Sequence, residues 1–308
     1  MKQLSGDIKH GSYLALAKGI SIVENELPGY LELLTGLREN NTTPVIGITG
    51  PPGAGKSTLV NALLRHWLQQ HKKIAVIAVD PSSPFNFGAL LGDRIRMNAF
   101  YTNKNIYIRS LASRGALGGL SSKIIEITDL VKDSLFDLVV VETVGVGQSE
   151  VEVAGLADCT IVALVPEAGD EVQTLKAGIM EIADIFVVNK ADRDNAEALY
   201  RNLRLMAHEK AGDEREIPVF KTVATDETGI AELAEEIENF VAAGNKITEK
   251  KIQLLAQKSW QLMQTRRMGG VSRYQLQKAI TDALQAGGFN LYSFTLNFMR
   301  QVFDNTSS

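Results

Sequence analysis

The feature that most constrains the fold of this chain is a glycine-rich stretch, Gly50–Thr58, which reads GPPGAGKST. A short apolar run, Val45–Thr49, precedes it, and a segment with Leu59, Leu63 and Trp67 at helical spacing follows it. The pattern predicts a strand, a tight turn and a helix, which is the context that a phosphate-binding loop requires. A glycine-rich turn that matches by chance is the alternative, and the flanking strand and helix disfavour it.

A loop of this kind meets a phosphate chain with successive backbone N–H groups and with the positive end of the helix dipole that follows. We expect Lys56 to reach the β- and γ-phosphates, where it serves both binding and catalysis, and Ser57 to offer its hydroxyl to Mg²⁺. The expected phosphate-binding residues are Gly50, Pro51, Pro52, Gly53, Ala54, Gly55, Lys56, Ser57 and Thr58.

Composition narrows the class of protein. The 308 residues carry a net charge of −4, which gives no electrostatic help to a nucleic-acid partner, so none is expected. The single cysteine, Cys159, excludes an internal disulfide, suits a reducing compartment and is predicted to be buried at a strand edge. No signal-peptide pattern and no apolar run of roughly 18 residues is present, so we expect a cytoplasmic protein without a membrane span.

Apolar runs alternate with helical patterns between residues 43 and 245, which predicts an α/β fold with a mostly parallel sheet covered by helices on both faces. The expected strands are Val45–Thr49, Ile74–Val79, Ile106–Arg109, Leu138–Val141, Thr160–Val165, Ile185–Val188 and Ile217–Lys221. Beyond the helix after the phosphate loop, the expected helices include Ser121–Lys132, Glu171–Ile182, Asp194–Lys210 and Ile230–Ala242.

Helical patterns also flank this predicted nucleotide domain. Two packed helices are expected within residues 12–40 of an N-terminal segment, 1–42, where a structural role is the preferred interpretation. A C-terminal region, 246–308, shows separate amphipathic helices with an aromatic stripe. Such helices form either a packed lid or an oligomer interface.

Acidic residues follow two of the predicted strands. Asp80 comes after Val79, and Glu142 comes after Val141. An acid at a strand end beside a phosphate loop is where a Mg²⁺ shell is normally completed, because ligands of a parallel sheet collect at the carboxyl ends of its strands. Asp80 alone is equally a turn or cap residue, and together the two acids favour a metal and phosphate site.

The tetrapeptide after another predicted strand, Asn189-Lys190-Ala191-Asp192, indicates the base. A carboxylate at Asp192 accepts from both N1–H and the 2-amino group of guanine, whereas adenine offers neither donor. We expect Asn189 and Lys190 to brace the loop and cover the base. Backbone N–H groups of Val223, Ala224 and Thr225 are expected to meet the guanine oxygen. The predicted nucleotide is GTP, with GDP as its hydrolysis product.

Taken together, these segments resemble the MeaB/ArgK family of P-loop GTPases that accompany adenosylcobalamin-dependent methylmalonyl-CoA mutase. The resemblance runs from about residue 12 into the C-terminal region and is carried by several long motifs. They are GPPGAGKST at 50–58, VDPSSP at 79–84, GDRIRM at 92–97, RSLASRGALGGLSS at 109–122, ETVGVGQSE at 142–150 and NKAD at 189–192.

The resemblance implies a homodimeric GTPase with a C-terminal dimerisation arm. Such a protein gates the delivery of adenosylcobalamin to a mutase of methylmalonyl-CoA or isobutyryl-CoA type, and protects or reactivates that enzyme. It also implies slow intrinsic GTP hydrolysis that the partner stimulates. Among the residues, it implies that Asp80, Asp93 and Glu142 are the Mg²⁺-site acids.

Three further positions follow from the family or from analogy with other GTPases. The segment 166–176, PEAGDEVQTLK, resembles a third switch in which Lys176 meets Glu142; an ordinary loop and helix start is the plainer interpretation. Gln148 is a candidate for orienting the attacking water, or for contacting the partner or second subunit. Phe87 in the first switch departs from the family pattern.

Three rival functions compete with this expectation. A nickel-delivery GTPase needs clustered His and Cys ligands, and here Cys159 stands alone among four scattered histidines. A transport-associated kinase needs a substrate hydroxyl and a base beside the γ-phosphate. The guanine-reading Asn189–Asp192 and the partner-like switches argue against a kinase. A regulatory module that senses GTP without useful turnover is the third.

Overall fold

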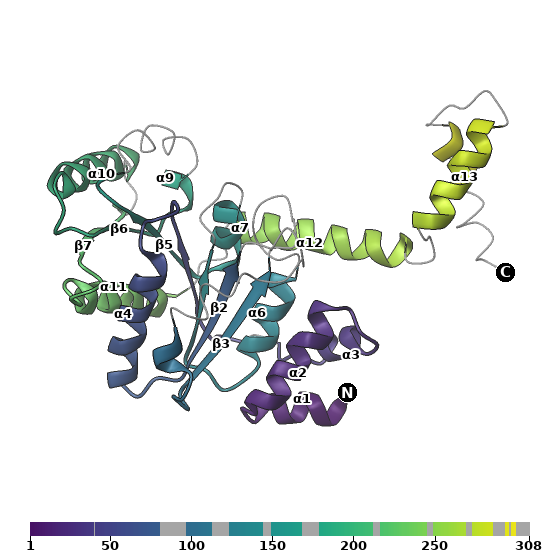
Figure 1. Ribbon diagram of the computed structural model, residues 1–308, viewed down its shortest axis with the longest axis horizontal. Coiled ribbons are helices and arrows are strands. Elements are labelled where there is room, and N and C mark those ends of the chain that lie inside the picture. Colours follow the sequence, from purple (N-terminus) through teal and green to yellow (C-terminus); the bar gives the residue numbers. More distant parts are fainter. Residues whose placement is uncertain are drawn as a thin grey trace. The chain divides into compact units, whose positions relative to one another are not determined.

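A computed structural model describes residues 1–39, 41–80, 97–112, 123–143, 149–167, 179–211, 216–244, 249–268, 273–285, 293–295 and 297–299 (Figure 1). The chain divides into two compact units, Met1–Lys251 and Ile252–Ser308. The strands are β1 Val45–Thr49, β2 Ile74–Asp80, β3 Ile106–Ala112, β4 Leu138–Glu142, β5 Cys159–Leu164, β6 Ile185–Asn189 and β7 Val219–Thr222.

Helices lie between the strands and on either side of the sheet-forming segment. Three precede β1, namely α1 Lys2–Lys9, α2 Tyr13–Glu24 and α3 Tyr30–Thr35. Those among the strands are α4 Lys56–Gln69, the 3-10 helix η1 Asn98–Phe100, α6 Ile124–Lys132, α7 Ser149–Leu156, α9 Ile179–Ile182 and α10 Ala196–Ala211. After β7 come α11 Ile230–Ala242, α12 Glu249–Met268 and α13 Arg273–Gln285.

The sheet has seven strands in the order β3-β2-β4-β1-β5-β6-β7, and every pairing in it is parallel. This confirms the predicted α/β fold with a parallel sheet. Strand β1 lies centrally between β4 and β5, with Ile48 opposite both Glu142 and Ile161. Because all strands run the same way, the segments that follow them meet at one edge, where ligands of such sheets bind.

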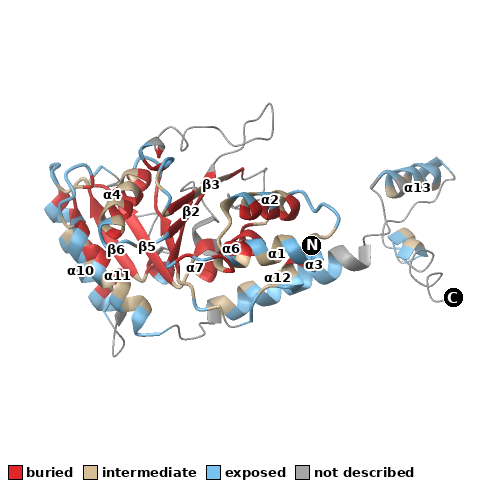
Figure 2. Ribbon diagram, turned by 90° about the horizontal axis from the view of Figure 1, so that it is seen from below, coloured by how far each residue is buried: buried red, intermediate tan, exposed pale blue. Residues whose placement is uncertain are grey.

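Alternate residues of the central strands pack against opposite layers of helices, as the two-residue repeat of a strand requires. Ile46 and Ile48 join a buried cluster with Leu63 and Trp67 of α4 and with residues of α11. Figure 1 shows α4 and α11 on the same side of the sheet. The intervening Gly47 faces α7, where an added Cβ would lie 3.0 Å from the Val153 side chain. Figure 2 shows the strands buried between these layers.

The N-terminal helices pack onto the outer part of this sheet. Tyr13 of α2 stacks on Phe136 with ring centroids 5.7 Å apart and contacts Tyr107 of β3 at 5.5 Å. Its hydroxyl donates to the Lys104 carbonyl at 2.8 Å. Arg109 of β3 pairs with Glu24 at the end of α2 at 2.8 Å. These contacts place α1, α2 and α3 in the same compact unit as the sheet.

The described residues of the C-terminal unit are helical. Helix α12 exposes several large apolar side chains, which are Ile252, Leu255, Trp260, Leu262 and Met263. Its first turn belongs to the larger unit, where Lys251 forms an ion pair of 3.0 Å with Asp158. None of the helices in the described ranges is both long and apolar enough to cross a membrane.

Candidate functional site

The phosphate-binding loop joins the end of β1 to the start of α4, as the sequence predicts. Three of its glycines adopt positive φ, +138° at Gly50 and +79° at both Gly53 and Gly55, a region that L side chains rarely enter. At Gly50, a Cβ would lie 2.0 Å from the carbonyl oxygen of Ala163 in β5. The glycine there is therefore required both by its backbone angle and by the close approach of a neighbouring strand.

Lys56, the first residue of α4, is buried, and its ammonium remains beside the loop. Its Nζ donates to the carbonyls of Gly50 at 2.8 Å and Pro51 at 3.1 Å. Gly55, in the left-handed conformation, begins the helix. A cation fixed at the N-terminus of a helix creates a local positive field that suits a phosphate chain.

Two residues predicted to bind Mg²⁺, Ser57 and Glu142, lie in contact with each other. The Ser57 hydroxyl donates to Oε1 of Glu142 at 2.7 Å, and both side chains are buried. A hydroxyl and a carboxylate are hard oxygen donors, which is the chemistry that Mg²⁺ requires, and Mg²⁺ usually needs only one or two carboxylates beside phosphates and water. The pair therefore fits the ion. No group of three His, Cys, Asp or Glu with metal-binding geometry occurs among the described residues.

Asp80 ends β2 at the same edge of the sheet. Ala78 pairs with Glu142 across the two strands, so the backbone of Asp80 lies beyond Glu142 in the strand direction. The other positions expected in the metal and switch regions lie outside the described residues. These are Asp93, Gln148 and Lys176, together with Phe87 of the first switch.

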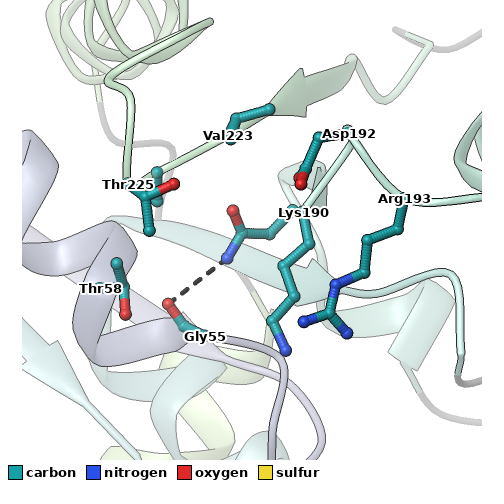
Figure 3. A pocket seen from close by; sticks show the side chains of 9 residues that line it. Gly55, Thr58, Lys190, Asp192, Arg193, Val223 and Thr225 are labelled. Atoms are coloured by element: carbon teal, nitrogen blue, oxygen red, sulfur yellow. Dashed lines mark hydrogen bonds between the residues drawn. The ribbon is translucent and has the colours of Figure 1, made fainter.

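A pocket of about 150 Å³ brings the expected base-binding residues together beside the phosphate loop. Figure 3 shows Asp192 and Lys190 toward the right, Val223 and Thr225 toward the left, and Gly55 below them. The full lining consists of Gly55, Thr58, Asn189, Lys190, Asp192, Arg193, Val223, Ala224 and Thr225. The structure thus gathers Asn189, Lys190, Asp192 and Val223–Thr225 at one place, although they come from two different strand ends.

Side chains of the Asn189–Asp192 loop, which is expected to read the base, donate hydrogen bonds to the phosphate loop. The buried Asn189 donates its Nδ2 to the Ala54 carbonyl at 2.9 Å and accepts from Thr222 Oγ1 at 3.1 Å. Lys190, with φ of +55°, donates Nζ to the Gly53 carbonyl at 2.8 Å. The two loops are therefore joined by side-chain hydrogen bonds.

The other wall of the pocket is a tight loop after β7. Main-chain bonds between Val223 and Thr228, at 3.1 and 3.2 Å, close it. Glu227 adopts φ of +58° and forms an ion pair of 2.5 Å with Arg65 on α4. The helix that carries the phosphate loop therefore also holds the loop that carries Thr225.

Sequence reasoning missed two ion pairs around this pocket. Arg193 lines it and forms an ion pair with Glu167, which follows β5. The hydrogen bond from Arg193 lowers the pKa of the Glu167 carboxyl, and the same bond raises the pKa of the Arg193 guanidinium. The Arg65–Glu227 pair was also missed. The position of Arg193 directly after Asp192 was the one available signal for either pair.

The fold and this site define a P-loop GTPase. A family model described as "Methylmalonyl Co-A mutase-associated GTPase MeaB" matches residues 16–275, so the chain belongs to the MeaB family.

Individual relatives agree with this assignment. A protein of Pyrococcus abyssi named as a GTPase is 43% identical over 252 residues, covering 79% of this chain and 78% of the relative. GTPase ArgK of Escherichia coli K12 is 38% identical over 247 residues, covering 77% and 74%. A crystal structure titled LAO/AO transport system kinase matches with a TM-score of 0.64 and 26% identity, covering 100% of this chain and 97% of that one.

Proposed function

We propose that this GTPase binds GTP with Mg²⁺ between the phosphate loop and the Asp192 pocket, and that hydrolysis controls its action on an acyl-CoA mutase. Ser57 and Glu142, with Asp80 and Asp93, would hold the ion, which would neutralise phosphate charge. Lys56 would bind the phosphates and Asp192 the guanine edge. Gln148 and Lys176 would act near the γ-phosphate.

We infer a specific role toward the mutase. The protein would gate the delivery of adenosylcobalamin to a mutase of methylmalonyl-CoA or isobutyryl-CoA type, and would protect or reactivate that enzyme. Slow intrinsic hydrolysis, accelerated by the partner, would time the exchange. The observation that carries this proposal is the match over residues 16–275 to a family described as mutase-associated.

A homodimer is part of the proposal. The exposed apolar side chains of α12, among them Leu255, Trp260 and Met263, support a contact with a second copy. Large apolar residues outside a core commonly mark an oligomer interface. Under this proposal, the region 246–308 is a dimerisation arm and residues 43–245 are the GTPase domain.

The test is to titrate the full chain with each mutase and to follow GTP hydrolysis and complex formation. We expect a complex and an accelerated release of phosphate with one of the two mutases. Lys56→Ala is the control, because it should lose nucleotide affinity and therefore acceleration while keeping its fold. A wild-type chain that hydrolyses GTP but neither binds nor responds to either mutase would overturn the chaperone role and leave the GTPase intact.

The base assignment has its own test. Asp192→Asn should shift preference from guanosine to xanthosine triphosphate, because the amide can donate to the 2-oxygen of xanthine. An unchanged preference for guanine would contradict the assigned role of Asp192. A transport-associated kinase is the second candidate, suggested by the name of one similar structure. A kinase would transfer the γ-phosphate of the nucleotide to an acceptor molecule, whereas a GTPase would release it as free phosphate.

A further inference from the structure

The ion pair between Glu167 and Arg193 joins two loops that leave neighbouring strands. Glu167 follows β5 and Arg193 follows β6, and the two strands pair with Leu164 opposite Val188. A guanidinium nitrogen of Arg193 donates to a carboxylate oxygen of Glu167. Arg193 lines the base pocket, and Glu167 stands outside the lining. The hydrogen bond from the Arg193 side chain links the carboxylate to a residue of the lining.

We propose that Glu167 is a positioning residue of the base pocket, which holds the base-reading loop in place through Arg193 and thereby slows the release of guanine nucleotide. This inference rests on the proposal that the pocket holds guanine.

The geometry of the loop explains why an outside carboxylate can position it. Lys190, at φ of +55°, occupies a conformation that non-glycine residues seldom adopt. The Arg193 N–H donates to the Lys190 carbonyl at 3.0 Å, which closes a turn around Asp192. Holding Arg193 at its outer end therefore constrains the turn that aims the Asp192 carboxylate.

Charge supplies a second reason. Lys190 and Arg193 extend from the same loop (Figure 3), and two neighbouring cations repel each other. The hydrogen bond from Arg193 is the largest effect that lowers the pKa of Glu167; a hydrogen bond from the backbone of Glu167 comes next, and the attraction of Arg193 and Lys190 adds less. The Glu167 carboxylate thus offsets the repulsion between Lys190, which is expected to cover the base, and Arg193.

The strand that precedes Glu167 also contacts the phosphate loop. The Ala163 carbonyl of β5 lies where a Cβ on Gly50 would stand, so the end of β5 packs directly on the first glycine of the loop. Glu167 therefore joins the base-reading loop to a strand end that is already fixed against the phosphate loop.

The expected effect is modest because the pair is exposed, with half of each side chain accessible. Pairs of this kind shift an equilibrium or rate by roughly two- to fivefold, and salt screens them. The experiment measures the dissociation rate of fluorescently labelled GDP from the full chain, chased with unlabelled GDP. Glu167→Gln and Arg193→Gln should each accelerate release about two- to fivefold.

Two comparisons separate the ion pair from other effects. The double variant should release GDP no faster than the faster single variant, and the charge exchange Glu167→Arg with Arg193→Glu should return the rate to within about twofold of wild type. The control is Arg201→Gln, which breaks an exposed ion pair with Glu197 on α10 at 3.2 Å and should leave release unchanged.

A fast Arg193→Gln variant beside an unchanged Glu167→Gln variant would overturn the proposal, because Arg193 would then act by touching the nucleotide alone. Equal acceleration by Arg201→Gln would overturn it as well. Failure of the wild-type chain to bind labelled GDP overturns the proposed function together with this inference. Tight binding with unchanged variants overturns the inference alone.

Discussion

The side-chain amide of Asn189 donates a 2.9 Å hydrogen bond to the main-chain carbonyl of Ala54, across 135 residues of sequence. The bond connects the loop proposed to read the base with the loop proposed to hold the phosphates. Both partners are buried, so water cannot replace it at low cost. The two halves of the pocket are therefore held in fixed register.

Asn189→Ala tests this relationship. The substitution removes the donor to Ala54 and the acceptor of the Thr222 hydroxyl, which leaves buried polar groups unsatisfied. We expect the free energy of unfolding to fall by about 1–3 kcal/mol and the affinity for GDP to fall with it. Denaturant unfolding and calorimetric titration measure the two quantities. Asn25→Ala is the control, because its amide also donates to a main-chain carbonyl, that of Ser21, but at an exposed site. Equal losses in both variants would show that the buried bond of Asn189 contributes no more than an exposed one.

Substitution by alanine should destabilise the protein far more at Gly50 than at Gly53, although both glycines belong to the phosphate loop. A Cβ at Gly50 would stand 2.0 Å from the Ala163 carbonyl, whereas one at Gly53 would meet nothing within 4 Å. Gly53→Ala should cost only about 1 kcal/mol, for its positive φ. Gly50→Ala should cost several times as much, because the main chain of β5 must move. Urea unfolding of both variants is the measurement, and similar midpoints would show that β1 and β5 are not packed as described.

Much of this architecture could be predicted because its signals are local. The phosphate loop and Asn189–Asp192 are short segments whose neighbours in sequence are also the strands that position them. Helix α11 was predicted with its observed bounds, Ile230–Ala242, because a strong apolar periodicity begins after Gly229. Cys159 was predicted as buried at a strand edge, and it is the buried first residue of β5.

The missed features depend on contacts between distant residues. Helix α1 contains Gly6, a poor helix former, and buries only Ile8, so its sequence offers few apolar residues as a signal. The pair Arg65–Glu227 joins residues 162 positions apart, and Arg193–Glu167 joins residues 26 apart. With 22% of the chain charged, opposite charges are too common for the sequence to indicate which of them meet.

The Ser57–Glu142 contact predicts how nucleotide binding depends on Mg²⁺. Ser57→Ala removes the hydroxyl that lies 2.7 Å from Glu142 and should abolish most of the gain in GTP affinity that Mg²⁺ confers. Ser57→Thr keeps a hydroxyl at the same position and is the control. Titration of labelled GTP, with Mg²⁺ and with a chelator, measures the gain. A gain in Ser57→Ala equal to that of wild type would exclude the hydroxyl from the metal site.

The buried hydroxyl of Tyr107 should make the free energy of unfolding fall in alkali, and Tyr107→Phe should remove this contribution. Burial raises its pKa from 10.0 to about 12, with a smaller opposing effect of Arg109. Because the folded state binds the proton more tightly than the unfolded chain, this contribution is complete below pH 10 and disappears as the pH rises through 12. A shift of this size corresponds to about 2–3 kcal/mol at most.

Tyr107→Phe keeps the ring contacts with Tyr13 and Phe136 but has no titrating hydroxyl. Unfolding free energies should therefore fall less steeply between pH 10 and 12 in the variant, while lysine titration, common to both proteins, cancels in the comparison. Parallel pH profiles would mean that the hydroxyl of Tyr107 is solvated in the folded protein.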